Sequence, residues 1–256
     1  MKSWPYPRVA AHRGGGTLAP ENTLAGLRAG ARFGHTMVEF DAKLAADNTV
    51  FLLHDDTVDR TSNGHGAAAR MPYAALATLD AGSWRDARFA GEPMPTLAQV
   101  AACCRELGLA ANVEIKPCAN RDEETGRLVA REAARLWATG ADADASSKPL
   151  LSSFSYAALS AARDAAPDLP RGLLYERVPE NWREQTGALG CVSLHASHRY
   201  LDAALVARIK AAGLFILAYT VNDLERAREL VRWGVDTICT DRIDVIGPRA
   251  LDSLER

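Results

Sequence analysis

The strongest constraint on the fold is a repeated alternation of short β-rich runs with segments of helical periodicity. Most strand candidates are followed by a stretch whose apolar residues recur at helical spacing. The strand candidates span residues 8–13, 36–41, 49–54, 111–116, 150–154, 171–175, 191–195, 214–220 and 237–241. The helix candidates span 21–33, 97–107, 122–138, 156–165, 181–188, 201–212 and 224–233. This alternation predicts a mostly parallel sheet, either open or closed into a barrel.

The number of strands favours the closed barrel. Only the stretch AKLAADN separates Asp41 from the run at 49–54, and it is too short for a parallel crossover. That run is therefore predicted to be the return arm of a hairpin turning near Asp47-Asn48, with His54 roughly opposite Asp41. Eight strand–helix units remain, which is the number that closes a TIM (β/α)8 barrel in a chain of 256 residues.

Residues 55–95 break the alternation. They are rich in Gly, Asp, Ser and Pro and carry no strong period. A segment of this length predicts an insertion at one end of the barrel, after the second barrel strand, that could cover a site. No second domain is visible, so residues 1–256 are expected to form a single domain.

Composition and charge restrict the partners. The net charge is −2 and 48% of the residues are hydrophobic, so neither a nucleic-acid surface nor stable membrane association is expected. The N-terminal stretch MKSWPYPRVAAHRGG lacks the apolar core of a signal peptide, and no run is long enough to span a membrane. The interpretation is a cytoplasmic protein that acts on a small molecule.

Three carboxylates are predicted to face the barrel interior at its C-terminal mouth. Glu39 and Asp41 alternate with Val38 and Phe40, so both acidic side chains point to one face of their strand. Glu114 follows the same pattern in the sequence NVEIKP. Each could simply pair with a basic residue, but together they make an oxygen-rich site for a divalent cation. Such a site suits Mg²⁺, Ca²⁺ or Mn²⁺ better than Zn²⁺.

Histidines and basic residues are expected at the same mouth. His12 ends the first strand and His54 ends the hairpin arm, and two imidazoles beside a carboxylate cluster can act as general acid and base. Arg13 and Lys116 add positive charge of the kind that binds phosphate. Three further residues at strand ends are candidate contacts or core residues: Phe154, Tyr219 and His195.

The glycines and the helix starts have structural interpretations. Gly14, Gly15 and Gly16 do not fit a nucleotide-binding pattern and are expected to turn the chain out of the first strand. In the sequence PENT, Asn22 or Thr23 is expected to cap the following helix. Asn222 is expected to cap the helix that begins at residue 224.

These residues resemble the glycerophosphodiester phosphodiesterases, most of all their cytoplasmic bacterial, UgpQ-type members. The matching segments occur in the family's order and spacing over nearly the whole chain. They are AHRGGGTLAPENTLAG, VEFDAKLAADNTVFLLHDDTVDRTSNGHG, MPTLAQV, NVEIKP, SSFS, AYTVN and TICTDRID. One departure is visible, because many members carry Trp where this chain has Tyr219.

The resemblance implies a TIM barrel that hydrolyses glycerophosphodiesters to sn-glycerol 3-phosphate and an alcohol. It implies that the glycerol 2-hydroxyl attacks phosphorus and that water then opens the cyclic phosphate. The implied roles, residue by residue, are catalysis by His12 and His54, phosphate binding by Arg13 and Lys116, and binding of one cation, Mg²⁺ first, by Glu39, Asp41 and Glu114.

Two rival hypotheses remain at this stage. The first is a phospholipase C-like or D-like lyase that stops at a cyclic phosphate, since related barrels share the histidine and carboxylate set. The second is a non-catalytic phosphodiester-binding module, which the presence of both histidines and all three acidic residues disfavours. The preferred alcohol and the oligomeric state are left open.

Overall fold

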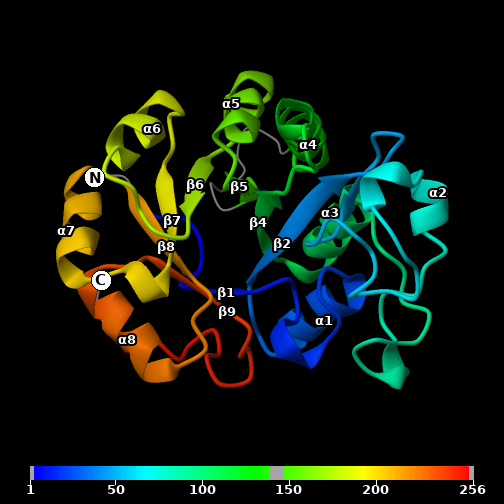
Figure 1. The fold of residues 1–256 in the computed structure, drawn as a ribbon. Coiled ribbons are helices and arrows are strands. Elements are labelled where there is room, and N and C mark those ends of the chain that lie inside the picture. Colours follow the sequence, from blue (N-terminus) through cyan, green and yellow to red (C-terminus); the bar gives the residue numbers. More distant parts are fainter. Residues whose placement is uncertain (1–2, 139–146, 254–256) are drawn as a thin grey trace.

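The computed structural model describes residues 3–138 and 147–253. Among them, nine strands form one sheet in the order β1-β9-β8-β7-β6-β5-β4-β2-β3, and an additional β1–β2 pairing closes it. The parallel barrel strands are β1 (Val9–Ala11), β2 (Met37–Leu44), β4 (Ala110–Ile115), β5 (Leu150–Ser153), β6 (Arg171–Tyr175), β7 (Ser193–Ser197), β8 (Phe215–Tyr219) and β9 (Thr237–Thr240). The predicted TIM barrel is confirmed, and Figure 1 views it with the helices arranged around the strands.

The remaining strand, β3 (Val50–Leu52), is the antiparallel return arm that the short connection predicted. Ala42 pairs with Leu52, and Asn48 takes a positive φ of 67° in the turn. The backbone N–H of Leu53 donates to the carbonyl of Asp41 at 3.1 Å. His54 therefore emerges one residue beyond the position opposite Asp41, at the C-terminal mouth.

Helices surround the barrel and coincide closely with the periodic segments. They are α1 (Leu24–Arg32), α3 (Leu97–Leu107), α4 (Asp122–Leu136), α5 (Tyr156–Ala165), α6 (Trp182–Ala188), α7 (Ala203–Ala211) and α8 (Leu224–Trp233), with short helices η1 (Gly16–Leu18) and η5 (His198–Tyr200). The helix α7 begins two residues later than predicted because Asp202 caps it through the N–H of Leu205. None of the described helices is long and apolar enough to cross a membrane.

Apolar side chains on the outer faces of the strands pack against the helices. Val38, Phe40 and Ala42 of β2 lie in a buried cluster with Val113 and Ile115 of β4. The residues between them in sequence therefore turn inward, which places acidic side chains inside the barrel. At the opposite end the barrel is closed by Trp4, whose indole N–H donates to Thr237 Oγ1 at 2.8 Å.

The segment 55–95 forms its own small layer beside the barrel mouth, at the right of Figure 1. It contains η2 (Ala68–Arg70), α2 (Tyr73–Leu76) and η3 (Ala87–Phe89). Val58, Leu76 and Met94 pack with Phe51 and Leu53 of the hairpin into a separate buried cluster. The hairpin therefore anchors this segment next to the C-terminal ends of the first barrel strands.

Candidate active site

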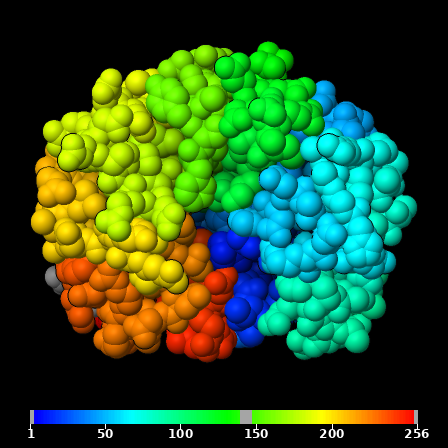
Figure 2. All heavy atoms as spheres, in the orientation of Figure 1, coloured from blue at the N-terminus to red at the C-terminus, as the bar shows by residue number. Residues whose placement is uncertain are grey.

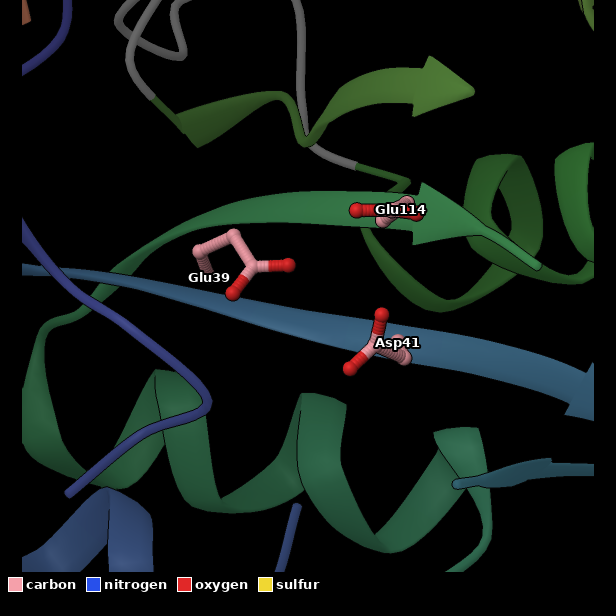
Figure 3. A group of neighbouring side chains, drawn as sticks. All are labelled: Glu39, Asp41 and Glu114. Atoms are coloured by element: carbon pink, nitrogen blue, oxygen red, sulfur yellow. The ribbon is translucent and has the colours of Figure 1, made fainter. Parts of the chain in front are cut away.

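The three predicted carboxylates meet inside the mouth of the barrel. Glu39 and Asp41 on β2 and Glu114 on β4 each place an oxygen within 4.8 Å of the others (Figure 3). The register pairs Asp41 directly with Glu114, and the exposed fractions are only 4%, 1% and 9% for Glu39, Asp41 and Glu114. Figure 2 shows the face onto which they open, which is hollowed near its centre.

The shared burial shifts the pKa values of this cluster. Burial, together with the charge of Asp41, raises the pKa of Glu114 to about 8 and that of Glu39 to about 6. Burial also opposes ionisation of Asp41, but Arg13 and Lys116 outweigh it and lower the pKa of Asp41. The positive charge of Lys116 and Arg13 does not fully offset the burial of Glu114 and Glu39, and a divalent cation would supply the rest.

His12 directly follows β1, and its ring is held by the carboxylate of Asp241, which directly follows β9. Its Nδ1 is 2.6 Å from Asp241 Oδ1, and its Nε2 is 3.7 Å from Glu39 Oε2. Because a carboxylate can only accept, the Nδ1 hydrogen points to Asp241 and Nε2 faces the acidic cluster. Burial opposes protonation of His12, but the bond to Asp241 and the charges of Glu39 and Asp241 together outweigh it and raise the pKa of the ring.

His54 is held in the same manner from the other side. Its Nδ1 is 2.7 Å from Asp55 Oδ1, so Nδ1 carries the hydrogen and Nε2 accepts from Lys116 Nζ at 2.8 Å. Burial lowers the pKa of His54, and the charges of Arg13 and Lys116 add to that effect. The two imidazoles thus flank the cluster with unlike proton affinities.

Arg13 and Lys116 bring positive charge to the carboxylates. Arg13 Nε lies 3.5 Å from Asp41 Oδ2 with no hydrogen-bond partner among the described residues, while Arg13 Nη1 donates to Glu21 Oε1 at 2.8 Å. Lys116 Nζ donates to Glu114 Oε1 at 3.0 Å. Both side chains thus contact the carboxylate cluster directly.

The glycine run forms the exit turn of β1. Gly14 and Gly16 take positive φ values of 88° and 52°. A Cβ on Gly16 would lie 2.1 Å from the carbonyl oxygen of Asp241, so only glycine lets the two loops pack. The turn thereby keeps the loop that carries Asp241 close to His12.

Of the expected helix caps, Thr23 of α1 is confirmed and Asn222 of α8 is wrong. Thr23, not Asn22, caps α1, and Asp223, not Asn222, caps α8. Asn22 instead donates from Nδ2 to Asp41 Oδ2 at 2.8 Å and accepts the N–H of Asp41 at 3.0 Å. Asn222 donates to Asp241 Oδ2 at 3.0 Å in the corresponding way. Both asparagines hold carboxylates of the site.

Phe154 and Tyr219 form an aromatic pair at the rim. Their ring centroids are 5.9 Å apart at an interplanar angle of 85°, and Lys116 Nζ lies 5.7 Å from the ring centre of Phe154. The Tyr219 hydroxyl donates to the carbonyl of Tyr175 at 2.8 Å. Phe154 is 47% exposed, so its free face is available to a bound molecule.

His195 lies in a different position from the one expected. β7 runs to Ser197, so His195 stands in mid-strand instead of at the strand end. Its ring is fully buried, with Nε2 at 3.0 Å from Ser193 Oγ and no hydrogen-bond partner for Nδ1 among the described residues. A Cβ on Gly172 would lie 2.3 Å from Nε2, so this glycine makes room for the ring. The contacts direct the ring away from the mouth, toward the start of β7.

Burial of this neutral ring predicts acid-sensitive stability. Desolvation lowers the pKa of His195 to about 3, below its ordinary 6.5. Below about pH 6.5 His195 is protonated in the unfolded chain but stays neutral in the folded chain. The free energy of unfolding therefore falls as the pH drops from 6.5 toward 3. His195→Gln should remove about 2 kcal/mol of that loss between about pH 6.5 and 5.

Urea unfolding at both pH values measures the difference. His65→Gln, at a histidine whose side chain is 87% exposed, serves as the substitution control. An unchanged slope for His195→Gln would mean that the ring is charged in the folded protein.

Several residues of the site carry no signal in local sequence. Glu21, Asn22, Asn222 and Asp241 contact partners from other parts of the chain, and Asp241 is 229 positions away from His12. Only the stretches PENT, AYTVN and TDRID, which belong to the resemblance, draw attention to them. Asp55 could have been found from its place next to His54.

A parallel barrel whose mouth carries two carboxylate-held imidazoles, an acidic cluster and two cationic side chains fits the class of phosphodiesterases. The family model of the glycerophosphoryl diester phosphodiesterases matches residues 12–245. A glycerophosphodiester phosphodiesterase of Caldanaerobacter subterraneus subsp. tengcongensis is 31% identical over 234 residues, covering 91% of this chain and 93% of the relative. The chain belongs to the glycerophosphoryl diester phosphodiesterase family.

Solved structures agree with this assignment. An Oleispira antarctica phosphodiesterase, in complex with the product sn-glycerol-3-phosphate, is 35% identical with a TM-score of 0.86, and the match covers 96% of each chain. A glycerophosphodiester phosphodiesterase from Agrobacterium tumefaciens, 24% identical with a TM-score of 0.76, shares the fold over 97% of this chain and 100% of its own.

Proposed function

We propose that this enzyme hydrolyses glycerophosphodiesters, the deacylated phospholipids, to sn-glycerol 3-phosphate and an alcohol. The observation that carries the proposal is the pair of imidazoles. Each has Nδ1 fixed by a carboxylate, and the two rings flank one acidic cluster. The likeness to a phosphodiesterase that binds sn-glycerol-3-phosphate supports the same product here.

Glu39, Asp41 and Glu114 would hold one divalent cation, with Mg²⁺ as the first choice and Ca²⁺ or Mn²⁺ as alternatives. Three carboxylate oxygens within 4.8 Å and no histidine or thiol among them form a hard donor set. When bound there, the cation neutralises the carboxylates and withdraws charge from the phosphate oxygens.

Arg13 and Lys116 would bind the phosphate beside this cluster. Arg13 Nε has no hydrogen-bond partner among the described residues, so it can donate to a phosphate oxygen. Lys116 contributes an ammonium that already contacts His54 and Glu114. Phe154 and Tyr219 would contact the glycerol or the alcohol. Of the two, Tyr219 stands where many members of the family carry Trp.

The two histidines would divide the proton transfers. His54 keeps a lone pair on Nε2 and a lowered pKa, which suits the group that accepts the proton of the attacking glycerol 2-hydroxyl. His12, whose pKa is raised by Asp241, suits the group that protonates the leaving alkoxide. In the second half of the reaction the roles reverse, and His12 accepts the proton of the water that opens the cyclic phosphate.

A coupled assay of sn-glycerol 3-phosphate release tests the proposed function. The substrates are glycerophosphocholine, glycerophosphoethanolamine and glycerophosphoglycerol, each assayed after chelation and again with Mg²⁺, Ca²⁺ or Mn²⁺ restored. We expect release that stops on chelation and returns with a cation. Activity that is indifferent to chelation would contradict the metal site. A cyclic phosphate that accumulates in ³¹P NMR spectra would instead indicate a lyase.

A further inference from the structure

Arg60, from the segment 55–95, bridges two carboxylates at the rim of the site. One edge of its guanidinium donates to Glu21, from Nη1 to Oε2 at 2.7 Å and from Nη2 to Oε1 at 2.8 Å. The other edge donates to Asp55, from Nε to Oδ2 at 2.6 Å and from Nη2 to Oδ1 at 3.1 Å. Two such forks on a planar group restrict its rotation.

Each of these carboxylates also holds a side chain of the catalytic site. Glu21 Oε1 accepts from Arg13 Nη1 at 2.8 Å, and Asp55 Oδ1 accepts from Nδ1 of His54 at 2.7 Å. The side chains of Arg13, Glu21, Arg60, Asp55 and His54 therefore form one continuous row. That row connects the loop after β1 to the end of the hairpin arm, and Arg60 is its middle member.

We propose that Arg60 is a positioning residue that orients Arg13 and His54 together, acting through Glu21 and Asp55. The inference rests on the proposed function, in which Arg13 binds phosphate and His54 transfers a proton. Arg60 would act only through the two carboxylates and would not contact the substrate. The segment 55–95 would thereby contribute to catalysis by completing the geometry of the barrel mouth.

The physical effect of Arg60 is different on the two sides. On one side, Arg60 shares the charge of Glu21, so Glu21 competes less with the substrate phosphate for Arg13. On the other side, Arg60 fixes Asp55, which keeps the hydrogen of His54 on Nδ1 and the lone pair on Nε2. Loss of Arg60 should therefore raise KM through Arg13 and lower kcat through His54.

A purely structural role would look different. The Arg60 side chain is 45% exposed, and Asp55 is 29% exposed. Exposed ion pairs contribute little to stability, so removing Arg60 should change the unfolding temperature only slightly. A variant of Arg60 that lowers kcat/KM without lowering the unfolding temperature would therefore show a positioning role, and not simple anchoring of the segment 55–95.

The experiment compares Arg60→Met and Arg60→Lys with Arg85→Met, an exposed arginine of the same segment. We expect Arg60→Met to lower kcat/KM by about 10²-fold, with both kcat and KM affected. Arg60→Lys should recover part of the loss, because lysine restores the charge without the fork. Low, non-denaturing concentrations of guanidinium should restore part of the activity of Arg60→Ala. Arg85→Met should match the unsubstituted enzyme.

Two further measurements make the result decisive. In a Glu21→Gln, Asp55→Asn background, adding Arg60→Met should have almost no further effect on kcat/KM. The ¹⁵N shifts of the His54 ring should show hydrogen on Nδ1 in the unsubstituted protein and a mixture of tautomers in Arg60→Met and Arg60→Lys. The tautomer does not depend on turnover, so it tests Arg60 even if the unsubstituted chain releases no sn-glycerol 3-phosphate. Unchanged kinetics with an unchanged tautomer would overturn the inference.

Discussion

Replacing His12 with alanine is expected to lower the rate of sn-glycerol 3-phosphate release by about 10³-fold. His12 is the imidazole that Asp241 holds at 2.6 Å, with Nε2 turned toward the carboxylate cluster. Without the ring, no group at that position can protonate the leaving alkoxide. The three carboxylates are unchanged by the substitution, so cation binding measured by calorimetry should remain within a few-fold of the original.

The leaving group makes this experiment more specific. An ester of p-nitrophenol needs little help from an acid, so His12→Ala should release p-nitrophenol from such a glycerophosphodiester at a much less reduced rate, while opening of the cyclic phosphate, which uses His12 as base, stays slow. His54→Ala should lose nearly as much on either substrate, since the attacking hydroxyl still needs a base. His65→Ala, whose side chain is 87% exposed, serves as the control and should be fully active. A His12→Ala enzyme with ordinary turnover on both substrates would refute the assignment.

The barrel could be predicted from sequence because its determinants are local. Alternation along β2 puts Glu39 and Asp41 on the face opposite Phe40, and the short connection after Asp41 requires a hairpin. Eight strand–helix units are compatible with few sheet topologies. In a closed barrel the C-terminal ends of all the parallel strands then meet at one rim. The limits of β7 could not be predicted as well, because Cys191 and Val192 are as apolar as the strand itself. His195 was consequently expected at the mouth.

The candidate site could be predicted only in part, for a related reason. A side chain that acts from a strand end is visible in the pattern, as His12, Glu114 and Lys116 are. The groups that orient those side chains come from loops, and pairs such as His12 and Asp241 exist only after the barrel has closed. Asn22 shows the difficulty clearly, because an asparagine ahead of a helix is a credible cap until Asp41 is seen to bind it.

Glu114→Gln is expected to abolish cation-dependent activity without lowering the stability of the metal-free protein. Burial and Asp41 raise the pKa of Glu114 to about 8 in the folded chain, above its ordinary 4.5. The contribution of Glu114 to the free energy of unfolding is complete below about pH 4.5. It is lost as the pH rises through 8, because Glu114 ionises more readily in the unfolded chain than in the folded one. Glutamine stays neutral, so at about pH 9 the metal-free variant should unfold at a higher temperature than the unsubstituted protein.

The same shift predicts how pH controls cation binding. A cation must displace the proton from Glu114, so affinity should fall by up to about tenfold per unit as the pH drops below 8. Thermal unfolding with and without Mg²⁺ tests both statements, and Mg²⁺ should stabilise the unsubstituted protein but not Glu114→Gln. Glu132→Gln is the matched control, because Glu132 is a partly buried carboxylate of α4 whose pKa is also raised by burial. Equal stabilisation of Glu114→Gln and Glu132→Gln by Mg²⁺ would place the cation elsewhere.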